Sequence, residues 1–210
     1  MAKLILLSDL KENDRLLNKL EDIFGGIKPS IAYIPSCSDP DRAYFKATTE
    51  FYNKIGIENI EYKDLDEEYD EIVTSNIFEH NAIHLSGGNT FYFLHLLRKR
   101  GFIDSLRTYV SNGGILIGVS AGSLLMTKTI ELAGYGEDGD LNGVGLKDMK
   151  ALGLVEFEFL PHWDGSEKTE QSISRYAKAK DITVYLCRDG DAVVVNNTKI
   201  EFIGDIRVIN

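Results

Sequence analysis

The sequence predicts an α/β fold in which a mostly parallel sheet is flanked by helices. Short, fully apolar runs that suit buried strands alternate with amphipathic segments that suit helices through most of the chain. Glycines mark the predicted helix ends, as at Gly25-Gly26 and Gly56. With 210 residues, 43% of them hydrophobic, the chain can bury a large core, and we expect a single domain over residues 1–210.

The first half of the chain is expected to contribute four strands separated by helices. The predicted strands are Leu4–Leu7, Ser30–Pro35, Ile57–Tyr62 and Asn81–Leu85. The predicted helices are Asp14–Phe24, a segment from the Asp39-Pro40-Asp41 cap to about Ile55, and a short solvated helix over the acidic stretch Asp64–Glu71. This alternation favours parallel pairing with helices on both faces of the sheet.

The second half begins in the same pattern and then becomes less regular. Its predicted elements are the helices 90–99 and 103–111, the strand 114–117, a long glycine-containing loop over 132–150, the strand 155–160, the helix 167–179 and the strand 182–187. Two antiparallel strands, 192–195 and 199–208, are expected to follow, joined by a tight turn at Asn196-Asn197.

Charge and composition exclude several classes of partner. The formal net charge of −10 argues against binding to nucleic acid or to an anionic membrane. Cys37 and Cys187 form no Cys-x-x-Cys pair, and no cluster has metal-ligand spacing, so we expect neither a metal nor a cofactor. The apolar N-terminal run is too short for a signal peptide and no stretch is long enough to span a membrane. We therefore expect a cytoplasmic protein; its oligomeric state is left open.

The pentapeptide Gly118-Val119-Ser120-Ala121-Gly122 is the main candidate for chemistry. A Gly-x-Ser-x-Gly pattern arises by composition about 0.1 times in such a chain, so the pattern alone is a weak signal. Its position is more informative, because it follows a buried strand and precedes an apolar, helix-like run. Such a strand-turn-helix context presents a serine nucleophile, here Ser120. An ordinary structural turn is the alternative interpretation.

A second glycine turn, Gly87-Gly88-Asn89, also follows a predicted strand. It lacks the spacing of a phosphate-binding loop. A plain strand-to-helix turn and one half of an oxyanion hole are both compatible with it, and the second fits best, because a glycine amide can approach a substrate carbonyl closely. Ligands in parallel α/β folds bind beyond the carboxyl ends of the strands, so this turn and Ser120 are expected to share one crevice.

A serine nucleophile needs a base, and the base needs an acceptor that orients it. His80 and His95 lie next to or on helices, and His84 lies inside a strand, where a core role is favoured. His162 follows Pro161 at a strand end and is the best candidate base.

Five loop aspartates could orient that base: Asp138, Asp140, Asp164, Asp189 and Asp191. Asp189 ends a predicted strand and would lie at the same sheet edge if that strand were parallel. The order serine, histidine, acid differs from that of α/β-hydrolases, which argues against an ordinary lipase or esterase fold.

Three ordered motifs resemble the dipeptidase E and cyanophycinase group of serine peptidases: Ser-Gly-Gly-Asn-Thr-Phe at 86–91, Gly-Val-Ser-Ala-Gly at 118–122 and Leu-Pro-His at 160–162. The resemblance extends from Leu4 to about Val195. It implies a fold related to class I glutamine amidotransferases, with serine where those enzymes carry cysteine. It also implies Ser120 as nucleophile, His162 as base and the amides of Gly88 and Ala121 as oxyanion donors.

The resemblance ranks the candidate acids. In the aspartyl dipeptidase member a glutamate followed by glycine after a late strand is the third residue, and Asp189-Gly190 is similar to that position. A loop aspartate has also been considered in the family, for which Asp138 and Asp140 are the lower-ranked equivalents.

One departure concerns the substrate site. Thr169 stands where aspartyl dipeptidase has an arginine that pairs with a substrate aspartate, and a neighbouring lysine does not replace a bidentate guanidinium. We expect Asn89 and Thr169 to contact a small peptide substrate of different side-chain preference. An esterase or amidase with the same serine, and a non-catalytic binding module with the same fold, are the alternative functions.

Overall fold

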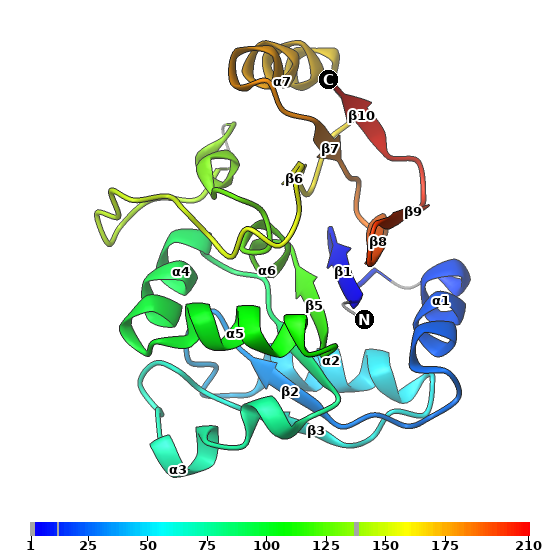
Figure 1. The fold of residues 1–210 in the computed structure, drawn as a ribbon, viewed down its shortest axis with the longest axis vertical. Helices are drawn as coiled ribbons and strands as arrows, with labels where there is room; N and C mark the ends of the chain where they lie inside the picture. Colours follow the sequence, from blue (N-terminus) through cyan, green and yellow to red (C-terminus); the bar gives the residue numbers. More distant parts are fainter. Residues whose placement is uncertain (1–2, 12, 137–138) are drawn as a thin grey trace.

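Two β-sheets organise the computed structural model, which describes residues 3–11, 13–136 and 139–210 (Figure 1). The larger sheet has seven strands in the order β3-β2-β4-β5-β1-β8-β9. Its strands are β1 (Lys3–Leu7), β2 (Ile31–Ile34), β3 (Ile60–Tyr62), β4 (Ala82–Leu85), β5 (Ile115–Val119), β8 (Ala192–Asn196) and β9 (Lys199–Ile203). Strands β1 to β5 pair in parallel, whereas β8 and β9 are antiparallel. The mostly parallel sheet predicted from the sequence is confirmed.

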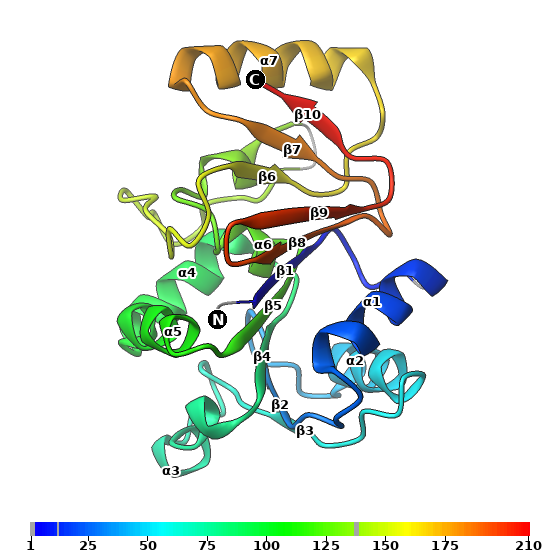
Figure 2. The same ribbon diagram turned by 45° about the vertical axis from the view of Figure 1, so that its right-hand side comes forward.

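Helices cover both faces of this sheet, as Figure 2 shows. One face carries α1 (Asp14–Phe24) and α2 (Ala43–Asn53), and the other carries α4 (Thr90–Lys99) and α5 (Phe102–Ser111). Strand residues therefore alternate between two buried clusters: Leu4 and Leu6 pack on the α4–α5 side, and Ile5 and Leu7 pack on the α1–α2 side. Burial on both faces explains why the strands read as unbroken apolar runs.

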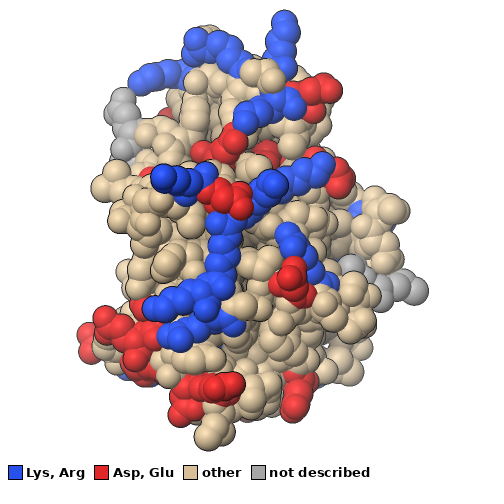
Figure 3. Space-filling view, turned by 60° about the vertical axis from the view of Figure 1, so that its left-hand side comes forward, with Lys and Arg blue, Asp and Glu red and all other residues tan. Residues whose placement is uncertain are grey.

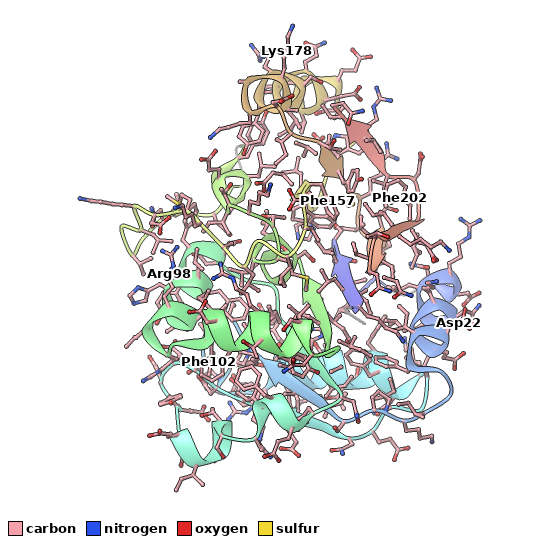
Figure 4. All side chains as sticks on the ribbon, in the orientation of Figure 1. Asp22, Arg98, Phe102, Phe157, Lys178 and Phe202 are labelled. Atoms are coloured by element: carbon pink, nitrogen blue, oxygen red, sulfur yellow. The ribbon has the colours of Figure 1, made fainter. Side chains whose placement is uncertain are left out.

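A second, three-stranded sheet has the order β10-β7-β6, with β6 (Glu158–Leu160), β7 (Val184–Leu186) and β10 (Arg207–Ile209). Helix α7 (Glu167–Lys180) covers it (Figure 2). We call β6, β7, β10 and α7 the small-sheet region, and the seven-stranded sheet with its helices the large-sheet region. An aromatic contact joins the two regions: Tyr185 of β7 packs on Phe202 of β9 at 5.1 Å. Phe157, just before β6, also packs on Tyr185, at 4.4 Å. Phe157 and Phe202 are labelled in Figure 4.

Two sequence-based expectations about the elements were wrong. The predicted strand 199–208 is two strands, because Gly204 turns the chain at a φ of 103° and sends β10 to the other sheet. No helix covers residues 64–70; the short helix α3 (Glu71–Thr74) begins only after Asp70, whose side chain accepts hydrogen bonds from the amides of Ile72 and Val73. The Asp64 carboxylate instead bonds the amide of Asp66 and holds the chain in a turn.

The remaining elements are short. They are the helix α6 (Ala121–Leu124) and the 3-10 helices η1 (Ile77–Glu79) and η2 (Glu131–Gly134). On the face drawn in Figure 3, basic and acidic side chains are interspersed. Lys178 points away from the body of the protein on the outer side of α7 (Figure 4). Within the described ranges, no helix is both long and apolar enough to cross a membrane.

Candidate active site

Ser120 occupies a sharp turn between β5 and α6. Its backbone has a φ of 48° and a ψ of −106°, a conformation that residues other than glycine rarely adopt. The amide of Ser120 donates to the carbonyl oxygen of Leu7 at the end of β1, at 2.9 Å. Such a strained backbone persists only where the surrounding structure holds it, and strained residues of this kind cluster at functional sites.

The two glycines of the pentapeptide make room for this turn. A Cβ at Gly118 would lie 2.4 Å from the carbonyl carbon of Gly122, and a Cβ at Gly122 would lie 2.2 Å from the carbonyl oxygen of Leu85. Ser123 ties the turn down, because its hydroxyl lies within hydrogen-bond distance of the carbonyl oxygens of Leu7 (2.8 Å) and Gly118 (2.9 Å). Close backbone approach therefore requires glycine at both flanking positions.

His162 and Asp189 complete a chain of hydrogen bonds that starts at Ser120. The Nε2 atom of His162 lies 2.9 Å from the Ser120 hydroxyl oxygen, and its Nδ1 atom lies 2.6 Å from a carboxylate oxygen of Asp189. His162 follows β6, and Asp189 lies in the connection from β7 to β8. The pattern fits an imidazole that donates its Nδ1–H to Asp189 and accepts from Ser120.

The other candidate acids have different partners. Asp140 accepts a hydrogen bond from the amide of Thr90 at 2.7 Å. Asp164 accepts one from the amide of Ser166, and Asp191 from the amide of Arg188. Asp138 lies outside the described residues. Of the four loop aspartates that the structure describes, Asp189 is the one bonded to the imidazole.

The turn 87–89 lies beside Ser120. A Cβ at Gly87 would be 3.6 Å from the Cβ of Ser120, and Gly88 has a φ of 124° that favours glycine. Among the described residues, neither the amide of Gly88 nor that of Ala121 donates to a protein acceptor. Two free amides next to the serine are the arrangement that a developing oxyanion requires.

The predicted substrate contacts differ in their surroundings. Asn89 uses both ends of its side chain in the protein: it accepts from the amide of Tyr92 and donates to the carbonyl of Leu141, each at 2.9 Å. It therefore caps α4, and it is not among the residues that line the cavity. Thr169, in the first turn of α7, does line the cavity. Substrate contact by either residue stays a prediction.

A cavity of about 490 Å³ opens at Ser120 and His162, within the size range of small-molecule sites. Helix α7 forms one wall with Lys168, Thr169, Ser172 and Arg175. The cavity is also lined by two acidic residues, Asp140 and Asp164. The sequence analysis missed Arg175, although its spacing of three and seven residues from Ser172 and Lys168 places all three on one helix face.

Sequence reasoning also missed Ser8, which contacts the loops that carry the base and the acid. The Ser8 hydroxyl accepts from the amide of His162 at 2.8 Å and donates to the carbonyl of Cys187 at 3.3 Å, and the Ser8 amide donates to the carbonyl of Asp191 at 3.1 Å. The side chain is fully buried. His162 has a φ of 55°, so this amide bond fixes a strained residue.

The segment after Ser8 holds the acid. The Asp9 carboxylate accepts from the amide of Gly190 at 3.2 Å, and the Asn13 side chain donates to the carbonyl of Gly190 at 2.9 Å. Ser8 lies at the carboxyl end of β1, next to β5, where ligands bind in parallel sheets. This position was the sequence signal that could have pointed to Ser8 and to the residues that follow it, Asp9 and Asn13. In the described part of the chain, no group of three His, Cys, Asp or Glu side chains is placed to hold a metal ion.

Comparison with known proteins identifies similar sequences and folds. Residues 4–203 match the model of Peptidase family S51. An uncharacterized peptidase of Listeria monocytogenes is 25% identical over 205 residues, covering 95% of this chain and 97% of that protein. A Peptidase E of a Nostoc species is 28% identical over 202 residues, covering 89% and 77%. A probable alpha-aspartyl dipeptidase of Drosophila melanogaster is 29% identical over 136 residues, covering 60% and 55%.

Among solved structures, a putative Peptidase E protein from Listeria monocytogenes has a similar fold. It superposes with a TM-score of 0.78 at 23% identity and covers 97% of this chain and 98% of its own. At that identity the likeness concerns the fold alone, a mixed α/β arrangement with a large, mostly parallel sheet between helices.

Proposed function

This chain belongs to Peptidase family S51, and from that premise we propose that it is a serine dipeptidase that hydrolyses small peptides through an acyl-enzyme on Ser120. The observation that carries the proposal is the unbroken hydrogen-bond chain from Ser120 through His162 to Asp189 at the edge of the cavity. A 2.9 Å contact between the serine and the imidazole also argues against a non-catalytic binding module, for which a wide separation is expected.

In the first half of the reaction, the Ser120 oxygen attacks the scissile carbonyl carbon and its proton passes to Nε2 of His162. The carbonyl oxygen becomes an oxyanion, which the amides of Gly88 and Ala121 stabilise. When the tetrahedral intermediate collapses, the carbon–nitrogen bond breaks and the imidazolium gives its proton to the leaving amine. Asp189 orients the ring and stabilises its positive charge without taking the proton.

In the second half, water attacks the acyl-enzyme and gives a proton to His162. The second intermediate collapses, the ester bond to Ser120 breaks, and the imidazolium returns the proton to the serine oxygen. The products are an amino acid and the shortened peptide, which for a dipeptide is a second amino acid.

We also propose a preference for an acidic N-terminal side chain, served by Arg175. Arg175 lines the cavity, and among the described residues its guanidinium has no ion-pair partner. One relative is named a probable alpha-aspartyl dipeptidase. A planar guanidinium six residues further along α7 can bind a carboxylate bidentately, which compensates for Thr169 at the expected arginine position.

The remaining expectations belong to the same proposal: one peptidase domain with a fold related to class I glutamine amidotransferases, and a cytoplasmic location. The parallel sheet with the serine turn at a strand end supports the fold part of this proposal.

The test is hydrolysis of a dipeptide panel by the purified protein and three variants. We expect turnover that disappears in Ser120→Ala and falls by roughly 10³- to 10⁴-fold in Asp189→Asn, because the imidazole then loses its orienting carboxylate. Arg175→Ala should lower kcat/KM for Asp-Xaa far more than for Ala-Xaa. Turnover of simple esters without cleavage of any dipeptide would favour an esterase or amidase instead.

A further inference from the structure

The cavity wall at the start of α4 is built from the loop around Asp140. This loop is held to the protein at three points. Asp140 accepts from the amide of Thr90 at 2.7 Å, its own amide donates to the carbonyl of Ala133 at 2.8 Å, and the next carbonyl, that of Leu141, accepts from Asn89 at 2.9 Å. The carboxylate is thus fixed in place by the protein alone, which favours binding because little entropy is lost when a ligand arrives.

Thr90 provides an independent sign that a ligand belongs here. The residue is fully buried, yet its hydroxyl oxygen has no hydrogen-bond partner in the described part of the chain. Thr90 lines the same cavity as Ser120. A buried hydroxyl without a partner is unfavourable, so a ligand group that supplies the missing hydrogen bond is stabilised at this point.

The wall is close to the expected position of the scissile bond. Thr90 is two residues from Gly88, the proposed oxyanion donor, so the two are separated by at most about 7 Å of chain. In a peptide cleaved after its first residue, the α-ammonium nitrogen is only two bonds from the carbonyl carbon that Ser120 attacks. A group that binds this nitrogen must therefore lie near Gly88, where the Asp140 carboxylate is bonded to the Thr90 amide.

The charges of the cavity walls determine which wall can bind an ammonium group. Only one oxygen of Asp140 is used by Thr90, and its second oxygen has no hydrogen-bond partner among the described residues. An ammonium group has three donors and no acceptor, which suits a carboxylate oxygen together with a hydroxyl. The α7 wall carries Arg175, which would repel an ammonium group. Asp164 also lines the cavity, but it is exposed and bonded to Ser166 at the start of α7.

We propose that Asp140 and Thr90 form the subsite that binds the α-ammonium group of the substrate. This inference rests on the proposed function and adds a requirement to it: a free amino terminus, with cleavage after the first residue. It also gives Asp140 a role in binding instead of the alternative role in the triad.

The experiment compares two substrates that differ only in this group: a dipeptide and its des-amino analogue, in which hydrogen replaces the ammonium. We expect Asp140→Asn to lower kcat/KM for the dipeptide by about 10- to 100-fold, the range for a hydrogen bond to a charged group, and to change it by less than about threefold for the analogue. The amide oxygen introduced by this substitution can still accept from Thr90, so the wall is preserved. Asp164→Asn is the matched control, and it should leave the ratio between the two substrates at the wild-type value.

A second measurement needs no variant. The α-amino group of a peptide has a pKa of about 8, so wild-type kcat/KM for the dipeptide should fall above that pH, and this alkaline limb should be absent with the analogue. An equal loss on both substrates in Asp140→Asn, or the same alkaline limb for both, would overturn the subsite. Either result leaves the proposed function intact, because that function is tested separately, by cleavage of any dipeptide and by its loss in Ser120→Ala.

Discussion

The large-sheet and small-sheet regions hold their parts of the site in different ways. Ser120 lies on the large sheet, where backbone atoms crowd Gly118 and Gly122 so closely that neither position has room for a Cβ. His162 and Asp189 follow strands of the small sheet, and their side chains are 50% and 48% exposed. Core packing therefore determines where the serine stands, whereas a few hydrogen bonds determine where the imidazole and the carboxylate stand.

The two regions are joined at the end of β1. The carbonyl of Leu7 accepts from the amide of Ser120, and the hydroxyl of Ser8 accepts from the amide of His162. Two adjacent residues thus set the serine and the histidine relative to each other. Substitutions in the large-sheet turn should act mainly on stability, and substitutions at this junction should act mainly on catalysis.

The largest effect on stability is expected for Gly118→Ala. The new methyl group would lie 2.4 Å from backbone atoms that cannot move without breaking the turn, so the free energy of unfolding should fall by about 3 kcal/mol or more. Urea unfolding measures it. Gly143→Ala is the control, because nothing lies within 4 Å of a Cβ there, and it should change the value by less than about 0.5 kcal/mol. Equal effects of the two substitutions would contradict the packing argument.

Ser8→Ala should have a smaller effect on stability and a clear effect on rate. Loss of the hydroxyl leaves the His162 amide without its acceptor, and we expect kcat to fall by roughly 10- to 100-fold with little change in KM, because the imidazole is displaced. The free energy of unfolding should fall by about 1–3 kcal/mol.

The control for Ser8 is Thr127→Val. Thr127 is also fully buried, and its hydroxyl lies within hydrogen-bond distance of the carbonyls of Leu124 and Thr129. We expect Thr127→Val to lose about as much stability as Ser8→Ala but to keep the wild-type kcat. If Thr127→Val lowered kcat as much as Ser8→Ala, the junction would have no special part in positioning the base.

Buried titratable groups give the two regions opposite responses to acid. His84 of β4 is buried in the large-sheet region, and burial lowers its pKa from 6.5 to about 3. The folded protein keeps it neutral, while the unfolded chain binds a proton below pH 6.5. Stability should therefore fall by about 1.4 kcal/mol per pH unit as the pH drops from 6.5 toward 3. Urea unfolding across this pH range should show that the free energy of unfolding depends less steeply on pH in His84→Gln than in the wild type. An unchanged dependence would contradict the assignment to His84.

The smallest effect is expected for Glu158 in the small-sheet region. Burial raises the pKa of this carboxyl, and one of its oxygens has no partner in the described residues. The contribution of Glu158 to the free energy of unfolding is present in acid and is lost as the pH rises through the folded-state pKa. Relative to the wild type, Glu158→Gln should thus gain stability as the pH rises from the ordinary carboxyl range to this raised pKa and level off above it, and a relative loss over that range would reverse the predicted sign.

The sequence predicted the large-sheet region better than the small-sheet region. Its strands are flanked by helices and read as continuous apolar runs, such as Leu4–Leu7, which periodicity detects. Strands β6, β7 and β10 have three residues each, and no local signal says which sheet they join. Asp189 was expected at the edge of the main sheet. It reaches His162 instead from a strand of the second sheet.

The contacts of Ser8 illustrate why part of the site could not be predicted. Its hydroxyl partners are 154 and 179 residues away in sequence, so no nearby pattern marks the residue. The glycine turns were detectable because the backbone geometry they need restricts the residue type. The roles of Ser120, His162 and Asp189 as nucleophile, base and acid stay predictions until they are measured.

The most direct measurement is labelling with a fluorophosphonate probe followed by peptide mapping. We predict one adduct, on Ser120 of the wild-type protein, with no adduct at that position in Ser120→Ala and much slower labelling in His162→Ala, because the hydroxyl then lacks its base. An unlabelled wild-type protein, or equal labelling of Ser120→Ala, would contradict the account that the two regions meet to activate this serine.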